Sequence, residues 1–271
     1  MRPYRHVALG GTFDRLHVGH DALLRAAFSA GETVFIGLTT DAYLASHPKA
    51  GRGSLLPYPE RARRLRRWLR TNASRRRWEI VPLEDRFGRA VGEGIDALVV
   101  SSETRGGGRA VNAERRDRGL GPLPLLEVPL VLADDLLPVS STRIRDGTLG
   151  PGGERLAPIR VGLATEAPAD LPPLTEAVRR AFRRAVVVAP RRRRAALTGG
   201  PARSRAARLA LGALRDAELA VGVARARQGG WWVAVRTARV GLAARPVGGG
   251  EPRLLTRGVV RLLRPARKKP L

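Results

Sequence analysis

A short apolar run, followed directly by two glycines and then by a helical pattern, constrains this chain most. The run is His6–Leu9, and Gly10 and Gly11 come immediately after it. From Val18 to Phe28 the apolar residues recur at helical spacing. A buried strand that stops at a glycine turn and leads into a helix is the starting unit of an alternating α/β fold. We therefore expect a parallel sheet with helices packed against it.

The same alternation continues through the first half of the chain. Glu60–Leu69 is expected to form an arginine-rich helix with one apolar face. The six arginines of Glu60–Thr71 are interpreted as a solvated face, with a basic stripe for RNA as the alternative. Further strands are predicted at Thr33–Leu38, Trp78–Leu83, Ala97–Val100 and Leu125–Leu132. The polar, glycine-rich segment Ser101–Gly121 is assigned to no element. In parallel sheets, ligands bind at the carboxyl ends of the strands.

The chain of 271 residues is long enough for two domains. A turn-rich stretch, Gly147–Gly153, predicts a boundary near residue 150. We expect a first domain over residues 1–149, a linker over 150–158 and a second, smaller α/β domain over 159–271. The hydrophobic content of 43% is sufficient for packed cores, which excludes wholesale disorder.

Positive charge is distributed unequally between the two halves. The net charge is +26, and the chain has only three lysines. Residues 1–150 carry 24 Lys and Arg and 17 Asp and Glu, a net charge of +7, whereas residues 151–271 carry 26 and 7, a net charge of +19. Such asymmetry suggests an RNA or another polyanion as partner, through residues 191–194 and the tail 261–269. A structural or dimerising appendage with biased composition is the preferred interpretation, and a homo-oligomer is left open.

Several other classes of protein are excluded by composition. Cysteine is absent, so disulfides and thiolate metal sites are excluded. No stretch approaches the roughly 18 uninterrupted apolar residues of a membrane helix. Asp14, His17 and His20 interrupt any apolar core of a signal peptide. We expect a cytoplasmic protein without a membrane partner.

Residues 10–20, Gly-Gly-Thr-Phe-Asp-Arg-Leu-His-Val-Gly-His, form the most informative pattern, here called the histidine motif. The two glycines let the backbone pass close to a bulky ligand. His17 and His20 lie one helical turn apart at a helix start, where free N–H groups favour anions. Histidines that only cap and pack are the less favoured alternative. The motif predicts a polyphosphate site in which both imidazoles donate to phosphate oxygens.

A second pattern, here called the serine motif, is Val-Ser-Ser-Thr-Arg-Ile-Arg at residues 139–145. Ser140, Ser141 and Thr142 can cap a helix and donate to phosphates. Arg143 and Arg145 can pair with the same phosphates. A serine-rich helix cap alone is usually structural, but this one follows the histidine motif in the same domain. The two motifs together predict a nucleotide site.

The two motifs resemble the signatures of the nucleotidyltransferases of the class I aminoacyl-tRNA synthetase-like superfamily. Over about residues 4–150 the chain resembles the archaeal-type phosphopantetheine adenylyltransferases. Further matching stretches are 57–61, 99–104, 112–115, 119–120 and 134–143. Nicotinate/nicotinamide-mononucleotide adenylyltransferases are the alternative, although the bacterial-type enzymes favour proline and isoleucine where Arg15 and Leu16 stand. A nucleic-acid-binding protein on an inactive nucleotidyltransferase scaffold is a third interpretation.

This resemblance implies a Rossmann-like domain that transfers AMP from ATP to 4′-phosphopantetheine, giving dephospho-coenzyme A and pyrophosphate. It implies that Thr12 and His20 contact the α-phosphate with His17 beside them, and that Thr12 also contacts the acceptor. Lys49 is expected to bridge the two phosphates, with Arg52 as the rival. The other implied ATP contacts are Gly10, Gly11, Phe13, Gly19, Glu103, Thr104, Ser140, Ser141, Thr142 and Arg143. Mg²⁺ is expected to arrive with ATP and to need no protein ligands.

The second half resembles the inosine/xanthosine triphosphatase family over about residues 159–245. The matching pieces are 175–182, 202–206, 220–223 and 230–234. Strands are predicted at Ile159–Ala164, Val186–Ala189, Leu219–Val223 and Trp231–Val235, and helices at Leu174–Phe182 and Ala202–Leu214. The family carries a glutamate and two glycines where this chain has Ala224, Arg225 and Ala226. Because a metal-dependent triphosphatase needs carboxylates for Mg²⁺, the second domain is predicted to be catalytically inactive.

Overall fold

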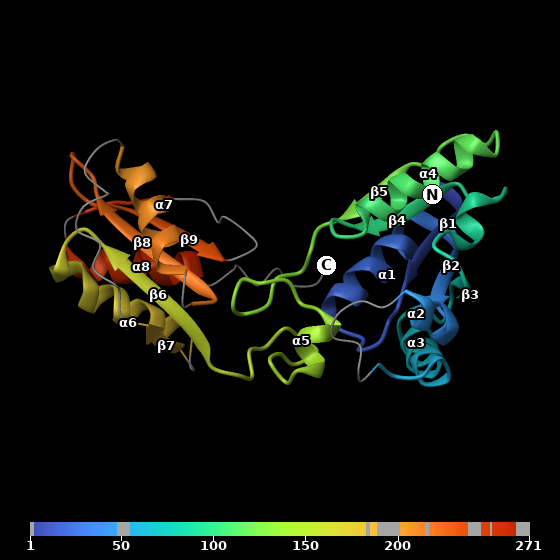
Figure 1. Ribbon diagram of the computed structural model, residues 1–271, viewed down its shortest axis with the longest axis horizontal. Coiled ribbons are helices and arrows are strands. Elements are labelled where there is room, and N and C mark those ends of the chain that lie inside the picture. Colours follow the sequence, from blue (N-terminus) through green and yellow to red (C-terminus); the bar gives the residue numbers. More distant parts are fainter. Residues whose placement is uncertain are drawn as a thin grey trace. The chain divides into compact units, whose positions relative to one another are not determined.

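The computed structural model describes residues 3–47, 55–182, 185–188, 201–214, 217–237, 245–249 and 251–263. The chain divides into two compact units, each with its own sheet (Figure 1). The first unit comprises Met1–Val131 and Val139–Gly153, and the second comprises Leu132–Pro138 and Glu154–Leu271. The predicted α/β fold class is confirmed. No helix among the described residues is long and apolar enough to cross a lipid bilayer.

The first unit contains a five-stranded parallel sheet with the order β3-β2-β1-β4-β5. Its strands are β1 (Tyr4–Gly11), β2 (Gly31–Thr39), β3 (Arg77–Leu83), β4 (Ala97–Ser101) and β5 (Leu125–Val128). Its helices are α1 (Val18–Ala30), α2 (Asp41–Ser46), α3 (Tyr58–Asn72), α4 (Arg105–Asp117) and α5 (Ser141–Arg145), with a 3₁₀ turn η1 (Gly88–Val91). All five predicted strands form. The fifth ends at Val128 instead of Leu132, because Pro129 follows and has no N–H for the ladder.

Two hydrophobic clusters cover the two faces of this sheet. On one face, α1 and α3 contribute Leu24, Phe28, Leu65 and Leu69, all buried against β1, β2 and β4. On the other face, Val111 of α4 packs with residues of η1, β1 and β4. Helices on both faces of the parallel sheet are the arrangement that the alternating pattern predicts.

Helix α4 forms within the glycine-rich segment to which the sequence assigned no element. A Cβ atom on Gly108 would lie 3.1 Å from side-chain atoms of both Leu125 and Val100. The glycine therefore lets the helix approach the sheet closely, and Val111 and Arg115 are buried one and two turns later. This packing outweighs the low helix propensity of three consecutive glycines.

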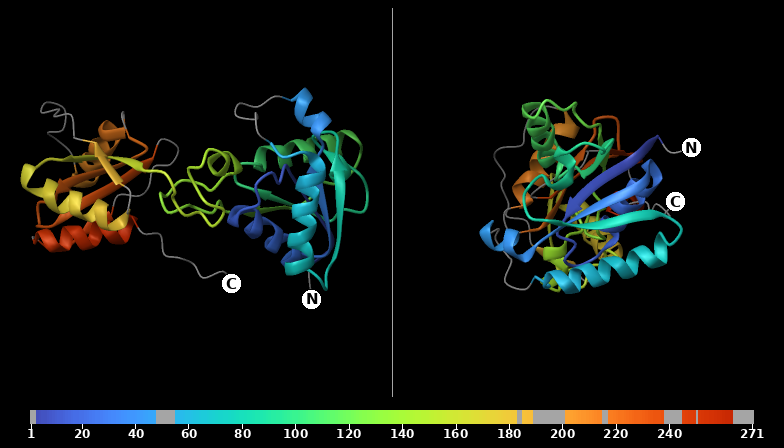
Figure 2. Two further views of the ribbon diagram at one scale, coloured as in Figure 1. Left: turned by 90° about the horizontal axis from the view of Figure 1, so that it is seen from below. Right: turned by 90° about the vertical axis from the view of Figure 1, so that its right-hand side faces the viewer.

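The second unit is built on a mixed sheet with the order β10-β9-β8-β6-β7. Only β7-β6 and β6-β8 pair in parallel. Its strands are β6 (Ile159–Thr165), β7 (Ala185–Val188), β8 (Leu219–Arg225), β9 (Trp231–Thr237) and β10 (Arg245–Val247), and its helices are α6 (Leu171–Ala181), α7 (Ala202–Ala213) and α8 (Pro252–Leu263), with a 3₁₀ turn η2 (Pro168–Asp170). Figure 2 shows α6 and α8 on one face of this sheet and α7 on the other. Helices α6 and α7 were predicted from the sequence, whereas α8 was not.

A seven-residue segment from between β5 and α5 belongs to the second unit. Leu136, in the segment Leu132–Pro138, is buried in the hydrophobic core of that unit. Asp135 is 0% exposed and forms an ion pair of 2.6 Å with Arg155. Arg155 in turn pairs with Glu218 at 2.9 Å. The chain therefore passes into the second unit once before the serine motif and again after residue 153.

We expect Gly222→Ala to destabilise the second unit by about 1–3 kcal/mol, because an added Cβ would overpack the contact between β8 and α7. That Cβ would lie 2.1 Å from the carbonyl oxygen of Ala206 and 2.4 Å from the backbone nitrogen of Ala210. Gly212→Ala is the matched control. Its Cβ meets nothing within 4 Å, and alanine favours the helix by about 1 kcal/mol. Urea unfolding of both variants measures the two effects, and equal midpoints would contradict this packing.

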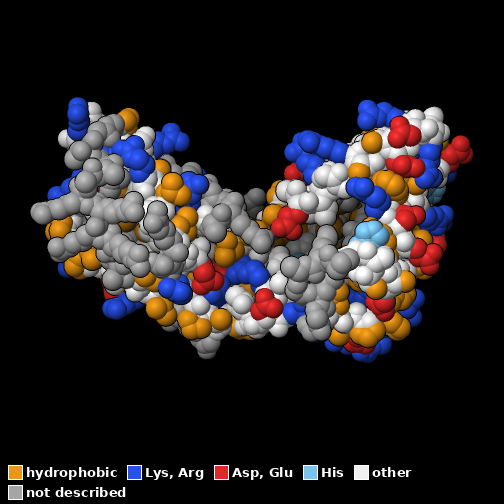
Figure 3. Space-filling model, in the orientation of Figure 1, with side chains coloured by type: hydrophobic (Ala, Val, Ile, Leu, Met, Phe, Trp, Pro, Cys, Tyr) orange, Lys and Arg blue, Asp and Glu red, His pale blue; other side chains and the backbone are white. Residues whose placement is uncertain are grey.

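Basic side chains on the visible described surface are interspersed with acidic and apolar ones, as Figure 3 shows for one face. Residues 191–194 and 264–269, on which the RNA hypothesis depends, lie outside the described residues. Trp231 is only 3% exposed and packs in the core. Its ring is therefore not available to stack on a nucleic-acid base.

Candidate active site

A cavity of about 720 Å³ opens in the first unit where β1 and β4 lie side by side. The chain crosses from β1 to β2 on one side and from β4 to β5 on the other, so the carboxyl ends of β1 and β4 form a topological switch point. Twelve of the predicted site residues line the cavity: Gly10, Gly11, Thr12, Phe13, His17, Gly19, His20, Glu103, Thr104, Ser140, Ser141 and Thr142. The fold thus brings the two motifs together.

His17 serves as the N-cap of α1. Its Nδ1 accepts hydrogen bonds from the backbone N–H groups of Gly19, at 3.1 Å, and His20, at 3.4 Å. A neutral imidazole that accepts at Nδ1 carries its proton on Nε2. The cap therefore fixes the tautomer and leaves Nε2–H as the only ring donor. The predicted role as a phosphate donor and the alternative role as a cap are compatible in this residue.

The two imidazole rings are stacked and held neutral. Their ring centroids are 3.9 Å apart. The ring of His20 also contacts that of Phe13, with a centroid distance of 5.0 Å. Burial lowers the pKa of His17 to about 4. Burial, and in second place the nearby His17, lower the pKa of His20 to about 3. Among the described residues, the buried Nδ1 of His20 has no hydrogen-bond partner. A buried polar atom without a partner calls for an explanation, and a ligand that supplies the missing hydrogen bond would be one.

We expect the first unit to lose stability as the pH falls from 7 to 5. Both histidines have lower pKa values in the folded protein than the 6.5 of the unfolded chain. Between about pH 6.5 and 4 the unfolded chain therefore binds protons that the folded chain does not, and the stability present above pH 6.5 is lost. The loss is about 2 kcal/mol for each histidine by pH 5. Urea unfolding at the two pH values measures it, and an equal loss in His17→Asn/His20→Asn would contradict this cause.

Thr12 and Phe13 stand at the sharp turn between β1 and α1. Phe13 is fully buried and has a φ of 47°, the left-handed region that residues other than glycine rarely adopt. The hydroxyl of Thr39, at the end of β2, donates to the carbonyl of Gly11 at 2.9 Å, and its oxygen lies 3.4 Å from the hydroxyl oxygen of Thr12. The neighbouring strand thus fixes the turn, which aims Thr12 into the cavity. Strained backbone of this kind is often found at ligand sites.

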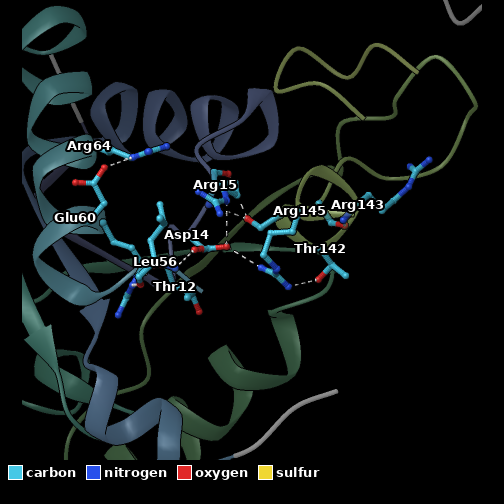
Figure 4. A network of polar contacts seen from close by, with 12 residues as sticks. Thr12, Asp14, Arg15, Leu56, Glu60, Arg64, Thr142, Arg143 and Arg145 are labelled. Atoms are coloured by element: carbon cyan, nitrogen blue, oxygen red, sulfur yellow. Dashed lines mark hydrogen bonds and ion pairs between the residues drawn. The ribbon is translucent and has the colours of Figure 1, made fainter. Parts of the chain in front are cut away.

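The serine motif forms the opposite wall of the cavity. Ser140 is the N-cap of α5, and its hydroxyl accepts from the backbone N–H of Arg143 at 3.4 Å. Ser141 and Thr142 line the cavity, as does Arg145. Arg143, a predicted ATP contact, is not among the lining residues, and Figure 4 shows its side chain directed away from Arg145.

Glu103 and Thr104 lie between β4 and α4, where the cavity meets the other face of the sheet. The hydroxyl of Thr104 accepts from the backbone N–H of Ser101 at 2.9 Å, which closes a tight turn after β4. Helix α4 begins at the next residue, Arg105. Both residues are expected ATP contacts, but the helix that starts beside them was not predicted from the sequence.

Arg61 contradicts the predicted solvated face of the arginine-rich helix, because its side chain is fully buried. Its guanidinium donates to the carbonyls of Leu56, Thr12 and Thr39, at 2.8–2.9 Å, and to the carboxylate of Asp41 at 2.6 Å. It therefore holds the turn at Thr12 in place through its hydrogen bond to the Thr12 carbonyl. This role could not be predicted from the sequence, because one arginine among six in a helix carries no distinguishing pattern.

Lys49 and Arg52, the two candidates for bridging the phosphates, lie outside the described residues. The chain is described up to His47 and again from Leu55, and both of these residues line the cavity. The assignment of a bridging role to either basic residue stays a prediction.

Comparison with known proteins identifies the family. A family model described as cytidylyltransferase-like matches residues 8–147. A phosphopantetheine adenylyltransferase from Methanopyrus kandleri is 43% identical over 143 residues, which cover 52% of this chain and 89% of that protein. The chain belongs to this family of adenylyltransferases. A second member, from Methanothermobacter thermautotrophicus, is 42% identical over 163 residues, or 60% of this chain and 96% of its own length.

A third relative has two activities in its name. It is a bifunctional phosphopantetheine adenylyltransferase/NTP phosphatase from Thermoplasma volcanium, 41% identical over 166 residues. The alignment covers 60% of this chain and 48% of that protein. The sequence of this chain resembles the same two kinds of protein, an adenylyltransferase in its first half and a triphosphatase in its second. The predicted recognition of an archaeal-type adenylyltransferase fused to a phosphatase-like domain is thereby confirmed.

Proposed function

We propose that the first unit transfers AMP from ATP to 4′-phosphopantetheine, a step of coenzyme A biosynthesis. The observation that carries the proposal is that the histidine and serine motifs line one cavity. The chain is also 43% identical over 143 residues to a named phosphopantetheine adenylyltransferase. A phosphate oxygen of the acceptor attacks the α-phosphorus of ATP. The new P–O bond forms as the bond to the β-phosphate oxygen breaks, and pyrophosphate leaves with the electron pair.

The residues of the cavity suit this reaction because it needs positioning and charge stabilisation more than a base. The acceptor phosphate is already ionised at neutral pH, so no side chain has to remove a proton. Thr12 and the ring donors of His17 and His20 would bind the α-phosphate, where negative charge accumulates in the transition state. Ser141 and Thr142 would bind the β- and γ-phosphates from the opposite wall. Holding both substrates in line accounts for a large part of such rate enhancements.

The other side of the cavity supports an acceptor with a long uncharged arm. Apolar side chains line the part of the cavity that faces α4 and η1: Phe35, Leu83, Phe87, Leu98, Val100 and Val111. The pantetheine arm can bury apolar surface against such a wall, whereas the nicotinate ring and ribose of a mononucleotide are shorter and more polar. This wall therefore favours phosphopantetheine over the alternative acceptor.

Mg²⁺ would accompany the nucleotide. Among the described residues, no group of three or more His, Asp or Glu side chains could hold a metal ion. We propose that the ion is held mainly by phosphate oxygens and water, which is how Mg²⁺ usually binds with nucleotides. When bound, the ion would neutralise charge on the leaving pyrophosphate.

Pyrophosphate release from ATP and Mg²⁺, with 4′-phosphopantetheine or nicotinate mononucleotide as acceptor, tests the proposal. We expect release with phosphopantetheine alone. Release with the mononucleotide alone would retain the reaction type and overturn the acceptor. No release with either would favour the nucleic-acid-binding interpretation, for which a short RNA at low salt is the matching probe.

For the second unit we propose that it does not hydrolyse nucleoside triphosphates. Glu166 and Asp170 follow β6, at the carboxyl end of a parallel pair. The guanidinium of Arg205 donates to Glu166, and that of Arg225 donates to Asp170 at 2.9 Å and 3.1 Å. Arg225 stands where the triphosphatase family carries a glycine. Carboxylates paired with arginines in this way are not free to hold Mg²⁺.

Incubation of the whole chain with ITP or XTP and Mg²⁺ tests this second proposal, and we expect no hydrolysis above a protein-free blank. Turnover would overturn it. Ala224→Glu, which would supply the missing carboxylate, is not expected to restore hydrolysis. Ala224 is 0% exposed and packs against α7, so a carboxylate there would be buried among alanines.

The remaining expectations stay proposals. We propose a cytoplasmic protein with a first domain over residues 1–149 and a second over 159–271. In the structure the segment 132–138 belongs with the second unit, so the first domain is interrupted there. Size-exclusion chromatography with light scattering would test for a homo-oligomer, and an RNA titration at low salt would test the less favoured nucleic-acid partner.

A further inference from the structure

One carboxylate in the histidine motif connects segments that are far apart in the sequence. Asp14 is 1% exposed. Its Oδ2 accepts a hydrogen bond from Nη1 of Arg145 at 2.7 Å, and its Oδ1 accepts one from the backbone N–H of Leu56 at 2.7 Å. Figure 4 shows the three residues converging from the histidine motif, from α5 and from the segment before α3. Asp14 thus links the histidine motif directly to the serine motif.

Helix α5 depends on such polar contacts, because it contributes no buried side chain to a hydrophobic core. It has five residues, and no apolar side chain among them is buried. The hydroxyl of Ser141 accepts from the backbone N–H of Arg15 at 3.4 Å and lies 3.3 Å from its carbonyl oxygen. Nη2 of Arg145 donates to the hydroxyl of Thr142 at 3.0 Å. Residues 14 and 15 therefore determine where both hydroxyls stand.

We propose that Asp14 is a positioning residue for the nucleotide: it orients Arg145 and so places Ser141 and Thr142 for the β- and γ-phosphates. A carboxylate at the wall of a polyphosphate site would repel the ligand unless it were paired. The Arg145 side chain is only 6% exposed, so the pair is shielded from solvent. Breaking a shielded pair from one side is costly, because the remaining charge is left buried. The inference rests on the proposed function for the identity of the nucleotide.

Asp14→Asn is the first test. Asparagine keeps the size of the side chain and an oxygen for the Leu56 N–H, but it removes the charge that faces Arg145. We expect the dissociation constant of ATP with Mg²⁺, measured by titration calorimetry without acceptor, to rise about tenfold or more. Asp21→Asn is the matched control in the first turn of α1, where the carboxylate pairs with Arg25 and is 30% exposed. Its effect should stay within about twofold.

Arg145→Gln, alone and combined with Asp14→Asn, tests whether Asp14 acts through Arg145. If it does, the double variant binds ATP within about twofold of Arg145→Gln alone, whereas independent roles would multiply the two losses and overturn the proposal. Arg145→Lys keeps a charge for Asp14 and should recover part of the affinity. This comparison carries the test if Asp14→Asn does not fold, as judged by its thermal unfolding midpoint. Arg145→Lys binding as weakly as Arg145→Gln would then overturn the proposal.

These measurements distinguish the proposed function from the role of Asp14. ATP binding needs no acceptor, so a failure to adenylylate phosphopantetheine would remove the proposed function and leave the role of Asp14 intact. Unchanged ATP affinity in a folded Asp14→Asn variant, with normal pyrophosphate release, would remove the role of Asp14 alone.

Discussion

Replacing His20 with alanine is expected to lower kcat for adenylyl transfer about 10²–10³-fold, the usual cost of removing one preorganised donor to a developing charge. The ring is held neutral by burial, which lowers its pKa to about 3, so its loss removes a hydrogen bond and not a positive charge. The KM for ATP should rise less than kcat falls, because the contact strengthens as charge builds up on the α-phosphate. Steady-state pyrophosphate release measures both constants.

His6→Ala provides the control for His20→Ala. His6 belongs to β1 and contacts Phe35 with a ring-centroid distance of 5.7 Å, but it is not among the residues that line the cavity. The same ring deletion there should leave kcat within about twofold, as expected for a substitution outside the site. If His20→Ala retained full kcat while remaining folded, the assignment of His20 to the α-phosphate would be wrong.

Arg155→Ala is expected to destabilise the second unit by about 3–5 kcal/mol, the cost of leaving a buried charge without its partner. Arg155 is 8% exposed, and it joins the fully buried Asp135 to Glu218 across three parts of the chain. It also donates to the backbone carbonyls of Ala157 and Pro158. Hydrogen exchange followed by mass spectrometry can locate the loss: peptides from β8 and β9 should exchange faster, whereas those from β1 and β2 should not change.

Arg180→Ala is the matched arginine deletion. Arg180 pairs with Glu176 one turn away on α6, and their side chains are 63% and 49% exposed. Such surface pairs contribute about 0.5 kcal/mol or less. Similar exchange of the β8 and β9 peptides in the two variants would show that the buried pair Arg155–Asp135 does not stabilise the second unit.

The residues that the sequence proposes for the candidate site lie close together in the chain. The histidine motif contains a strand end, a glycine turn and a helix start within eleven residues, so local geometry fixes how Gly11, Thr12 and His17 are arranged. The serine motif is equally local, since Ser140 caps the helix that follows it. Their meeting was predicted from the order of motifs in a resembling family, and parallel strands bring it about by ending at one edge.

Helix α4 and the buried Arg61 could not be predicted in the same way. Three consecutive glycines favour a loop by intrinsic propensity, and only the sheet surface next to Gly108 makes a close-packed helix favourable. Arg61 differs from Arg63 and Arg64 only in what surrounds it: carbonyl groups from three segments in one case and solvent with Glu60 in the others. Long-range neighbours leave no local pattern in the sequence.

By itself, the sequence determined the α/β class, the two motifs that line the cavity and the kinship with adenylyltransferases, because each depends on residues close together in the chain. Only the tertiary structure decided that Asp14 is paired with Arg145, that Arg61 supports Thr12, and that residues 132–138 belong with the second unit. Each of these depends on partners distant in sequence, and a buried charge reveals its partner only once the chain has folded around it.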